Sequence, residues 1–290
     1  VSPDNRFASF GTDMVGRRIY TIKIKNLETN EILSDTIENT TGGSVWANDN
    51  QTLFYTRQDK VTLRADTIYK HKLGTDAKDD VLVYEEKDET FNVSVGKEKS
   101  KKYIVIGAES TMTTEYRILN SDTPDAEFKV FQPRVRGLEY SISHFGDSFY
   151  ILTNKDKATN FKLMKTPENA TEKKHWKEVI AHRDDVLLED IEIFSNYLVV
   201  EERSNGLNHI RILPWSGEGE YYLPFGSETY NAYTTTNVDF DTDIYNRKIQ
   251  VAILQRIRSE KKFESIELLT KQLEEDRNFS RNYLQNLENK

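Results

Sequence analysis

The sequence contains no cysteine, which excludes disulfide bonds, thiolate metal sites and a cysteine nucleophile. It also has no long apolar run, since none approaches the roughly 20 residues that a helix needs to span a bilayer. We therefore predict no disulfide framework and no membrane span. The compartment stays open, because a chain without cysteine suits reducing and oxidising surroundings alike.

An excess of basic charge is missing as well. The 40 Lys and Arg residues stand against 48 Asp and Glu, the net charge is -8, and the basic positions are scattered along the chain. Proteins that bind nucleic acid usually gather their basic residues into a patch or stripe. Nucleic acid is therefore not predicted as a partner.

The apolar content is high enough for a folded protein. Hydrophobic residues make up 37% and aromatic residues 11% of the 290 positions. A chain of this length can bury one sizeable core or several small ones. It begins with a strand-like segment, without an initiator methionine or a signal-peptide pattern, so we expect the natural N-terminus to lie further upstream.

Short, apolar segments typical of β-strands recur along the chain at nearly constant spacing. Successive markers are 46, 50, 46 and 49 residues apart. This spacing is close to the roughly 40–50 residues of a propeller blade, whereas helical solenoid repeats are generally shorter. The markers, one from each segment, are Ala8, Phe54, Ile104, Tyr150 and Val199.

Each repeat is predicted to contain four strands. In the second repeat, residues 44–47 precede a turn at residues 48–50, and strands are expected at residues 53–56, 67–73 and 81–85. Asn and Asp suit the turn because they tolerate left-handed backbone geometry. Radially arranged four-stranded sheets form a β-propeller, which leaves only short edges exposed. About five units can be counted, and a sixth starts near Thr229.

The pattern changes toward the C-terminus. Apolar residues from about residue 256 onward recur at helical spacing among charged residues and glutamine. Residues 248–253 suit either a strand or a helix. We predict an all-β propeller at residues 1–250, incomplete as a ring, followed by an amphipathic helical tail at residues 251–290.

Several of these repeats resemble the propeller of the prolyl oligopeptidase family, and oligopeptidase B most closely. The similarity runs in order through roughly residues 1–243. The segments that carry it are VSPDNRFASFGTD at 1–13, RRIYTIKIKNLETNE at 17–31, VWANDNQTLFYTRQD at 45–59, VTLRADTIYKHKLGT at 61–75, VYEEKDETFNVSV at 83–95 and LVVEERSNGL at 198–207.

The resemblance implies a seven-bladed, non-catalytic propeller that gates a serine peptidase and filters its substrates by size. It also implies a partner, the α/β-hydrolase domain of the same protein, which this sequence does not reach. The substrates implied are short basic peptides cleaved after Lys or Arg, and the compartment is the cytoplasm or periplasm of a bacterium. The sequence departs from the family pattern after residue 243.

No catalytic serine is predicted. An α/β-hydrolase nucleophile stands on a Gly-x-Ser-x-Gly elbow, because small neighbours keep its hydroxyl clear. The nearest matches, at residues 42–44 and 225–227, lack the second glycine and fall where blade turns are expected. We therefore expect the chain alone to be inactive, and no catalytic residue is assigned.

No metal or cofactor site is predicted either. None of the five histidines has a partner at the helical spacing of a zinc protease, so ordinary strand or surface positions are the better interpretation. Asp239, Asp241 and Asp243 imitate the start of a calcium loop, but Ile244 and Gln255 stand where its glycine and glutamate belong. No Gly-rich phosphate loop is present. The histidines are His71, His144, His175, His182 and His209.

Two further features have both a functional and a structural interpretation. The acidic run Glu85, Glu86, Asp88 and Glu89 could attract basic peptides, but a solvated blade edge explains it as well. The tryptophans could stack on a ligand, whereas the repeat phase places the first of them between blades. They are Trp46, Trp176 and Trp215.

A different class of function stays open. Propellers host many unrelated functions, so the chain could be a stand-alone scaffold that binds other proteins. A third interpretation is a truncated or misread copy of the peptidase, with the residues after 243 outside the family pattern. A hydrolase reading frame directly downstream of the coding sequence would separate the scaffold from the other two.

Overall fold

The computed structural model describes residues 1–226, 229–235, 238–240, 263 and 265–288. The chain divides into two compact units, Val1–Thr242 and Asp243–Lys290. The first unit contains every described strand and the second contains the one described α-helix. Residues 248–253, whose sequence suits either a strand or a helix, lie outside the described residues.

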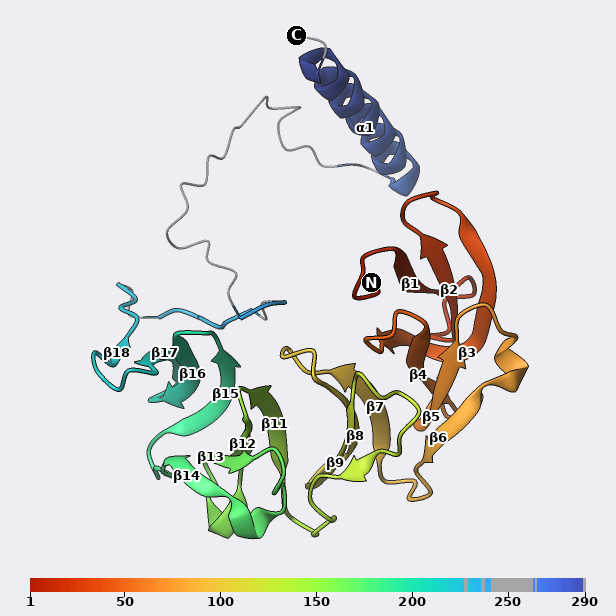
Figure 1. Ribbon diagram of the computed structural model, residues 1–290. Coiled ribbons are helices and arrows are strands. Elements are labelled where there is room, and N and C mark those ends of the chain that lie inside the picture. The colour runs from red at the N-terminus through yellow and green to blue at the C-terminus, as the bar shows by residue number, and fades with distance from the viewer. Residues whose placement is uncertain (227–228, 236–237, 241–262, 264, 289–290) are drawn as a thin grey trace. The chain divides into compact units, whose positions relative to one another are not determined.

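The first unit begins with a six-stranded antiparallel sheet whose strands follow one another in chain order (Figure 1). Its strands are β1 (Phe7–Thr12), β2 (Tyr20–Asn26), β3 (Ile32–Trp46), β4 (Thr52–Gln58), β5 (Ala65–Lys72) and β6 (Val81–Glu85).

Three four-stranded antiparallel sheets follow. The second sheet has β7 (Asn92–Lys97), β8 (Tyr103–Ser110), β9 (Thr113–Asn120) and β10 (Lys129–Val130). The third has β11 (Tyr140–Phe145), β12 (Ser148–Thr153), β13 (Lys162–Pro167) and β14 (Lys177–Ile180). The fourth has β15 (Leu187–Ile193), β16 (Tyr197–Ser204), β17 (Leu207–Pro214) and β18 (Tyr221–Tyr222). Short 3-10 turns lie at η1 (Ala77–Asp79), η2 (Lys155–Lys157) and η3 (Lys173–His175).

The six-stranded sheet consists of two blade units that share strand β3. The first part of β3 pairs with β2 and its last residues pair with β4. Between these parts Gly42 has φ +90°, and a Cβ atom there would lie 2.8 Å from the Tyr20 ring. A Cβ atom on Gly11 would lie 2.6 Å from the Cα atom of Gly42. Both glycines are therefore required where β3 passes from one blade to the next.

The predicted blade repeat is confirmed. Phe54, Ile104, Tyr150 and Val199 lie on β4, β8, β12 and β16, each the second strand of a four-stranded set. Ala8 lies on β1, which forms a hairpin with β2. Each of the other marker strands likewise pairs with the strand that follows it. The described chain thus contains four complete sets and a first set of three strands. No strand follows β18 within the described residues.

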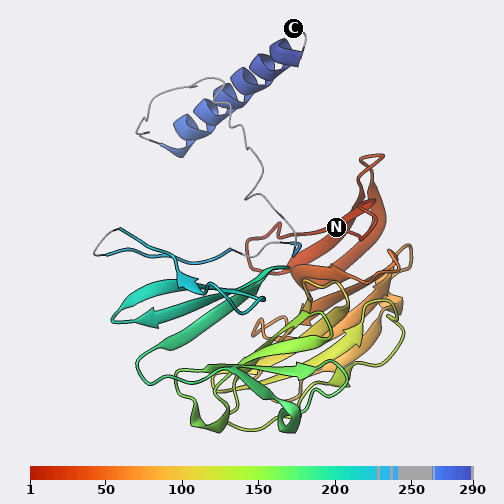
Figure 2. The ribbon, with the colours of Figure 1, turned by 60° about the vertical axis from the view of Figure 1, so that its left-hand side comes forward.

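The hydrophobic core lies between successive sheets. Ile22 and Ile24 of the first blade unit cluster with Leu53 and Tyr55 of the second. Similar apolar clusters join each later pair of sheets, and Figure 2 shows these sheets side by side. In the largest cluster, the fully buried Phe131 packs edge-on against Phe149 with ring centroids 5.0 Å apart. Each sheet is therefore stabilised mainly by its neighbours rather than by its own hairpins.

The second unit contains helix α1 (Ile266–Glu288), which confirms the predicted helical tail. Ser265 begins the helix, because its hydroxyl accepts a hydrogen bond from the Leu268 N–H at 3.3 Å. Leu268, Leu273 and Phe279 are about half exposed. Within the described part of the chain, no helix is long and apolar enough to cross a membrane.

Replacing Phe54 with Ala tests the packing between blades. The Phe54 side chain is fully buried and its ring lies edge-on to Phe128, with centroids 5.6 Å apart. We expect a loss of about 3–5 kcal/mol in the free energy of unfolding, because the deletion leaves a cavity. Val61, which is 89% exposed, gives the matched control. Urea titration measures both, and equal, near-zero changes for Phe54→Ala and Val61→Ala would contradict the assigned core.

Candidate functional site

The first strands of three sheets lie nearest the middle of the first unit. β7, β11 and β15 each form one edge of their sheet (Figure 1). Their side chains alternate: Val93 and Ile142 are buried, whereas Ser94 and Ser141 are exposed. This is the pattern of strands with one face in the core. The exposed residues of these strands are small, and all but Gly96 are polar.

One connection reaches from the second sheet toward all the others. The lysine hairpin, which comprises residues 97–102 from the last residue of β7 to the start of β8, carries four lysines and one glutamate. Its turn is closed by a hydrogen bond of 2.7 Å from the Lys101 N–H to the Glu98 carbonyl. Lys101 has φ +61°, a left-handed conformation that is uncommon outside glycine. The turn therefore directs successive lysines toward different neighbours.

Lys97 binds the first sheet. Its ammonium group donates to the Trp46 carbonyl at 2.9 Å and to Oδ1 of Asn48 at 2.6 Å. The Asn48 amide in turn donates to the Lys101 carbonyl at 3.3 Å. Both ends of the hairpin are thereby attached to the turn that precedes β4.

Lys99 binds the fourth sheet. Its ammonium group forms an ion pair with Glu192 of β15 and donates to the Ile193 carbonyl at 2.6 Å. It also lies 4.4 Å from the ring centroid of Phe194 and 5.2 Å from that of Phe240. The two side chains of the ion pair are each only 13% exposed. The third sheet lies between Lys99 and Glu192 in the sequence. The contact between the two residues therefore joins the second sheet directly to the fourth and fixes the separation of β7 and β15.

Lys102 binds the third sheet through a small ionic cluster. Its ammonium group lies 2.6 Å from Glu168, which also accepts hydrogen bonds from the Tyr103 hydroxyl at 3.2 Å and from Nε2 of His144 at 3.0 Å. The hydrogen bond from Lys102 is the main reason that the pKa of Glu168 lies below its usual range. The cluster therefore keeps Glu168 ionised next to the buried His144.

Glu98, on the same hairpin, has no ion-pair partner within the described residues. Its carboxyl group accepts a hydrogen bond from the backbone N–H of His144 at 3.0 Å. Burial among the inner strands raises its pKa to about 7. A carboxyl group with this pKa changes charge near neutrality, which surface glutamates do not.

The hairpin positions the sheets and has no groups arranged for catalysis. Its ammonium groups are engaged by carboxylates and carbonyl oxygens of the first, third and fourth sheets. Such partly buried, charge-assisted contacts are stronger than exposed ion pairs. The arrangement can therefore hold the inner strand edges at fixed distances. A run of lysines at a strand end is ordinarily a solvated loop, so the sequence alone gave no signal for this role.

Another ionic cluster, which sequence analysis missed, lies inside the six-stranded sheet. His71 of β5 is fully buried between Asp80, at 2.6 Å from Nδ1, and Asp35, at 3.0 Å from Nε2. Tyr55 donates to the second Asp80 oxygen at 2.7 Å. Burial works to lower the pKa of His71, but the hydrogen bonds to both aspartates outweigh it and raise the pKa. No solvent reaches the imidazole, so the cluster is structural.

Both Gly-Ser pairs were predicted to lie in blade turns, and this is wrong for the first pair. Gly42, Gly43 and Ser44 lie within β3, at its passage between two blades, rather than in a turn between strands. The Ser44 hydroxyl donates to Ser9 at 2.9 Å. Ser227 lies outside the described residues.

The acidic run does not act as one surface. Glu86 is buried and pairs with Arg134 at 2.6 Å, a contact that joins the end of β6 to the connection after β10. Burial opposes its ionisation, but hydrogen bonds from Arg134 and Tyr84 outweigh that effect and lower its pKa. The solvated-edge interpretation fits only the exposed members, which are Glu85, Asp88 and Glu89.

The tryptophans pack inside the protein. Trp46 is buried in the cluster between the first two blade units and stacks on Phe7, with ring centroids 6.3 Å apart, as the repeat phase predicts. Trp176 is 6% exposed and donates to the Thr171 carbonyl at 2.7 Å. Trp215 stacks on Phe145 with centroids 5.5 Å apart.

The calcium-like motif lies mostly outside the described residues, which include only Asp239 of its three aspartates. Asp239 forms an ion pair with Lys101 of the lysine hairpin. Among the described residues, no group of three or more His, Asp or Glu side chains is placed to hold a metal ion.

Comparison with known proteins adds an independent line of evidence. The family model of the prolyl oligopeptidase N-terminal beta-propeller domain matches residues 1–250. Dipeptidyl aminopeptidase BI of Pseudoxanthomonas mexicana is 41% identical over 243 residues, which cover 84% of this chain and 33% of that protein. Protease 2 of Moraxella lacunata is 33% identical over 227 residues, covering 77% of this chain and 32% of that protein.

Solved structures agree with these matches. Oligopeptidase B from Leishmania major gives a TM-score of 0.73 at 29% identity, covering 79% of this chain and 33% of that one. Oligopeptidase B from Trypanosoma brucei with covalently bound antipain gives 0.71 at 25% identity, covering 80% and 33%. The chain thus spans about a third of the length of these relatives. A second family model, riboflavin kinase, matches residues 221–284.

Glu98→Gln tests the buried carboxyl group of the lysine hairpin. Folding raises the pKa of Glu98 from 4.5 to about 7, so the stability it contributes is complete below about pH 4.5 and is lost as the pH rises through 7. Glutamine is always neutral. We expect the variant to match the wild type near pH 4.5 and to gain about 1–3 kcal/mol over it at pH 8.

Urea unfolding at both pH values measures this difference, with the exposed Glu89→Gln as the control for loss of one charge. A stability gap between Glu98→Gln and wild type that does not change with pH would contradict the raised pKa.

Proposed function

Since the chain belongs to the prolyl oligopeptidase family, as its N-terminal β-propeller domain close to oligopeptidase B, we propose that it gates a serine peptidase without performing the chemistry. The observation that carries this proposal is the lysine hairpin, which binds the first, third and fourth sheets from the second. A size filter needs an opening of constant width. Ionic contacts among the inner strand edges supply that rigidity.

The proposed partner is an α/β-hydrolase domain of the same protein. Its support is the coverage: the chain spans about a third of relatives that are peptidases by name. We propose short basic peptides, cleaved after Lys or Arg, as the substrates of the whole protein. This part of the proposal rests on the similarity to oligopeptidase B.

We further propose that residues 1–250 form the propeller domain and residues 251–290 a separate helical tail. The division into compact units near residue 242 supports this boundary. The riboflavin kinase match at residues 221–284 overlaps both parts and is much shorter than the propeller match. It supports a different origin for the tail and carries no activity for the chain.

The purified chain should not hydrolyse arginyl or lysyl peptide substrates. No Gly-x-Ser-x-Gly elbow occurs in the sequence, and without it no serine hydroxyl is held clear for attack. Release of a fluorescent leaving group from such a substrate is the measurement. Turnover that a serine-directed acylating reagent abolishes would overturn the non-catalytic assignment.

A chimera tests gating directly against the scaffold alternative. The part of this chain that is 41% identical to dipeptidyl aminopeptidase BI, 243 residues in length, would replace the matching segment of that protein. We expect the chimera to cleave short peptides and to leave a long unfolded chain intact. The unmodified relative is the control. A second comparison is a variant of the relative from which the propeller has been deleted. The size filter would be contradicted if a folded chimera cleaved the long chain as fast, relative to the short peptide, as that variant does.

Deleting residues 251–290 tests the domain boundary. Because the tail belongs to a separate compact unit, the remaining chain should keep its thermal unfolding midpoint within about 2 °C. Circular dichroism should lose only the helical signal. A large drop in the midpoint would show that the propeller depends on the tail.

A further inference from the structure

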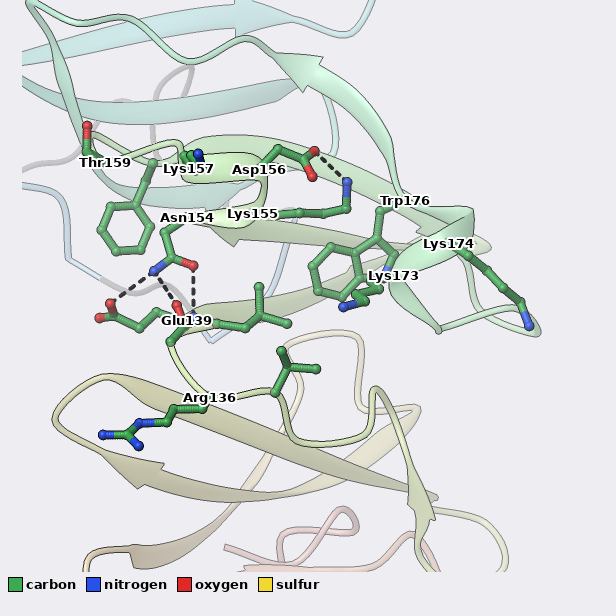
Figure 3. Close-up of a pocket in the computed structure, with 14 residues that line it drawn as sticks. Arg136, Glu139, Asn154, Lys155, Asp156, Lys157, Thr159, Lys173, Lys174 and Trp176 are labelled. Atoms are coloured by element: carbon green, nitrogen blue, oxygen red, sulfur yellow. Dashed lines mark hydrogen bonds and ion pairs between the residues drawn. The ribbon is translucent and has the colours of Figure 1, made fainter.

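A cleft of about 720 Å³ opens where the second sheet meets the third (Figure 3). One wall is the connection that leads into β11, including Arg136 and Glu139. The other walls are the connection between β12 and β13, residues 154–161, and the turn η3 before β14. The volume lies within the range of sites that hold small ligands or a few peptide residues.

The cleft is basic although the chain as a whole is acidic. Its lining includes five cationic side chains and two carboxylates. One of the carboxylates, Asp156, already lies 2.5 Å from Lys155 and 3.2 Å from Lys162. Among the residues that the structure describes, Arg136, Lys157 and Lys173 have no ion-pair partner. The cationic residues of the lining are Arg136, Lys155, Lys157, Lys173 and Lys174.

The walls are held in place by hydrogen bonds. The Asn154 side chain accepts from the Glu139 N–H at 2.9 Å and donates to the Gly137 carbonyl at 3.0 Å and to the Glu139 carboxylate at 3.0 Å. Figure 3 shows this amide between the two connections. A rigid site loses little conformational entropy when a ligand binds. The cleft is therefore preformed.

The floor of the cleft is apolar. Leu138 and Trp176, both nearly buried, belong to the core between the second and third sheets. Phe161, with φ +58°, also lines the cleft and packs against the core between the third and fourth sheets. A left-handed conformation is costly for a bulky residue and persists only where its surroundings enforce it. An apolar side chain of a ligand could rest on this floor while its charged neighbours meet the rim.

We propose that this cleft binds short acidic peptide segments that also carry an apolar side chain. Unpaired cations at the rim favour carboxylates by charge complementarity, and the floor favours an aliphatic or aromatic group. The rim cations come from three separate connections, which suits several spaced carboxylates better than one compact phosphate group. A long nucleic acid would meet repulsion from a protein of net charge -8. The proposal is independent of the gating function.

Fluorescence anisotropy with a labelled, glutamate-rich short peptide containing one central leucine tests the site. We expect saturable binding that weakens as salt is raised. Arg136→Glu combined with Lys157→Glu should weaken it by about tenfold or more, because each change replaces attraction with repulsion. Arg17→Glu combined with Lys60→Glu, at exposed positions in the β1–β2 and β4–β5 connections, is the matched control and should bind like the wild type.

Lys157 has φ +65°, so Lys157→Asn provides a neutral variant that tolerates the same backbone geometry. It should weaken binding by a smaller factor while keeping the thermal unfolding midpoint. The proposal would be overturned by no saturable binding by the wild type, by equal loss in the cleft and control variants, or by equal binding of a lysine-rich peptide. Tighter binding of a single-stranded oligonucleotide than of the acidic peptide would do the same.

Discussion

The burial of apolar faces between successive sheets is the constraint on which the rest of this structure depends. A single antiparallel sheet of short strands has two faces and cannot cover either by itself. Here the inner face of each sheet is covered by the next one, as Ile22 and Ile24 meet Leu53 and Tyr55, and as Phe131 meets Phe149. The polar contacts of the lysine hairpin depend on this stacking, because the stacking brings the partner residues from different sheets within reach.

Ionic contacts add specificity to that apolar framework. The lysine hairpin and the cluster of Asp35, His71 and Asp80 both place charges out of water, which is costly unless each charge is matched. In both cases hydrogen bonds satisfy the charged atoms from several strands. Apolar packing alone tolerates small shifts between sheets, whereas a buried ion pair such as Lys99 with Glu192 requires one arrangement. The contacts of the lysine hairpin therefore stabilise one particular arrangement of the inner strand edges.

The two ends of the unit differ from its middle. The first blade unit has three strands, with Gly11 and Gly42 in backbone contact where the chain crosses to the second. The fourth sheet ends in the short strand β18. The chain spans about a third of the length of its peptidase relatives, and its described part consists of blades and one helix. The basic cleft between the second and third sheets belongs to the complete, central part of the unit.

Local pattern was sufficient to predict the blades, their period and the helix at the C-terminal end, because alternation, turn residues and helical spacing depend on neighbours a few positions apart. It also placed Trp46 between blades, since the repeat phase fixes which strand it follows. The sequence could not predict the lysine hairpin, the pairing of Glu86 with Arg134, or the aspartates around His71. Those contacts join residues between 9 and 138 positions apart. Only the packing of whole sheets brings them together, and the same packing decides which charges lose water and therefore which pKa values change.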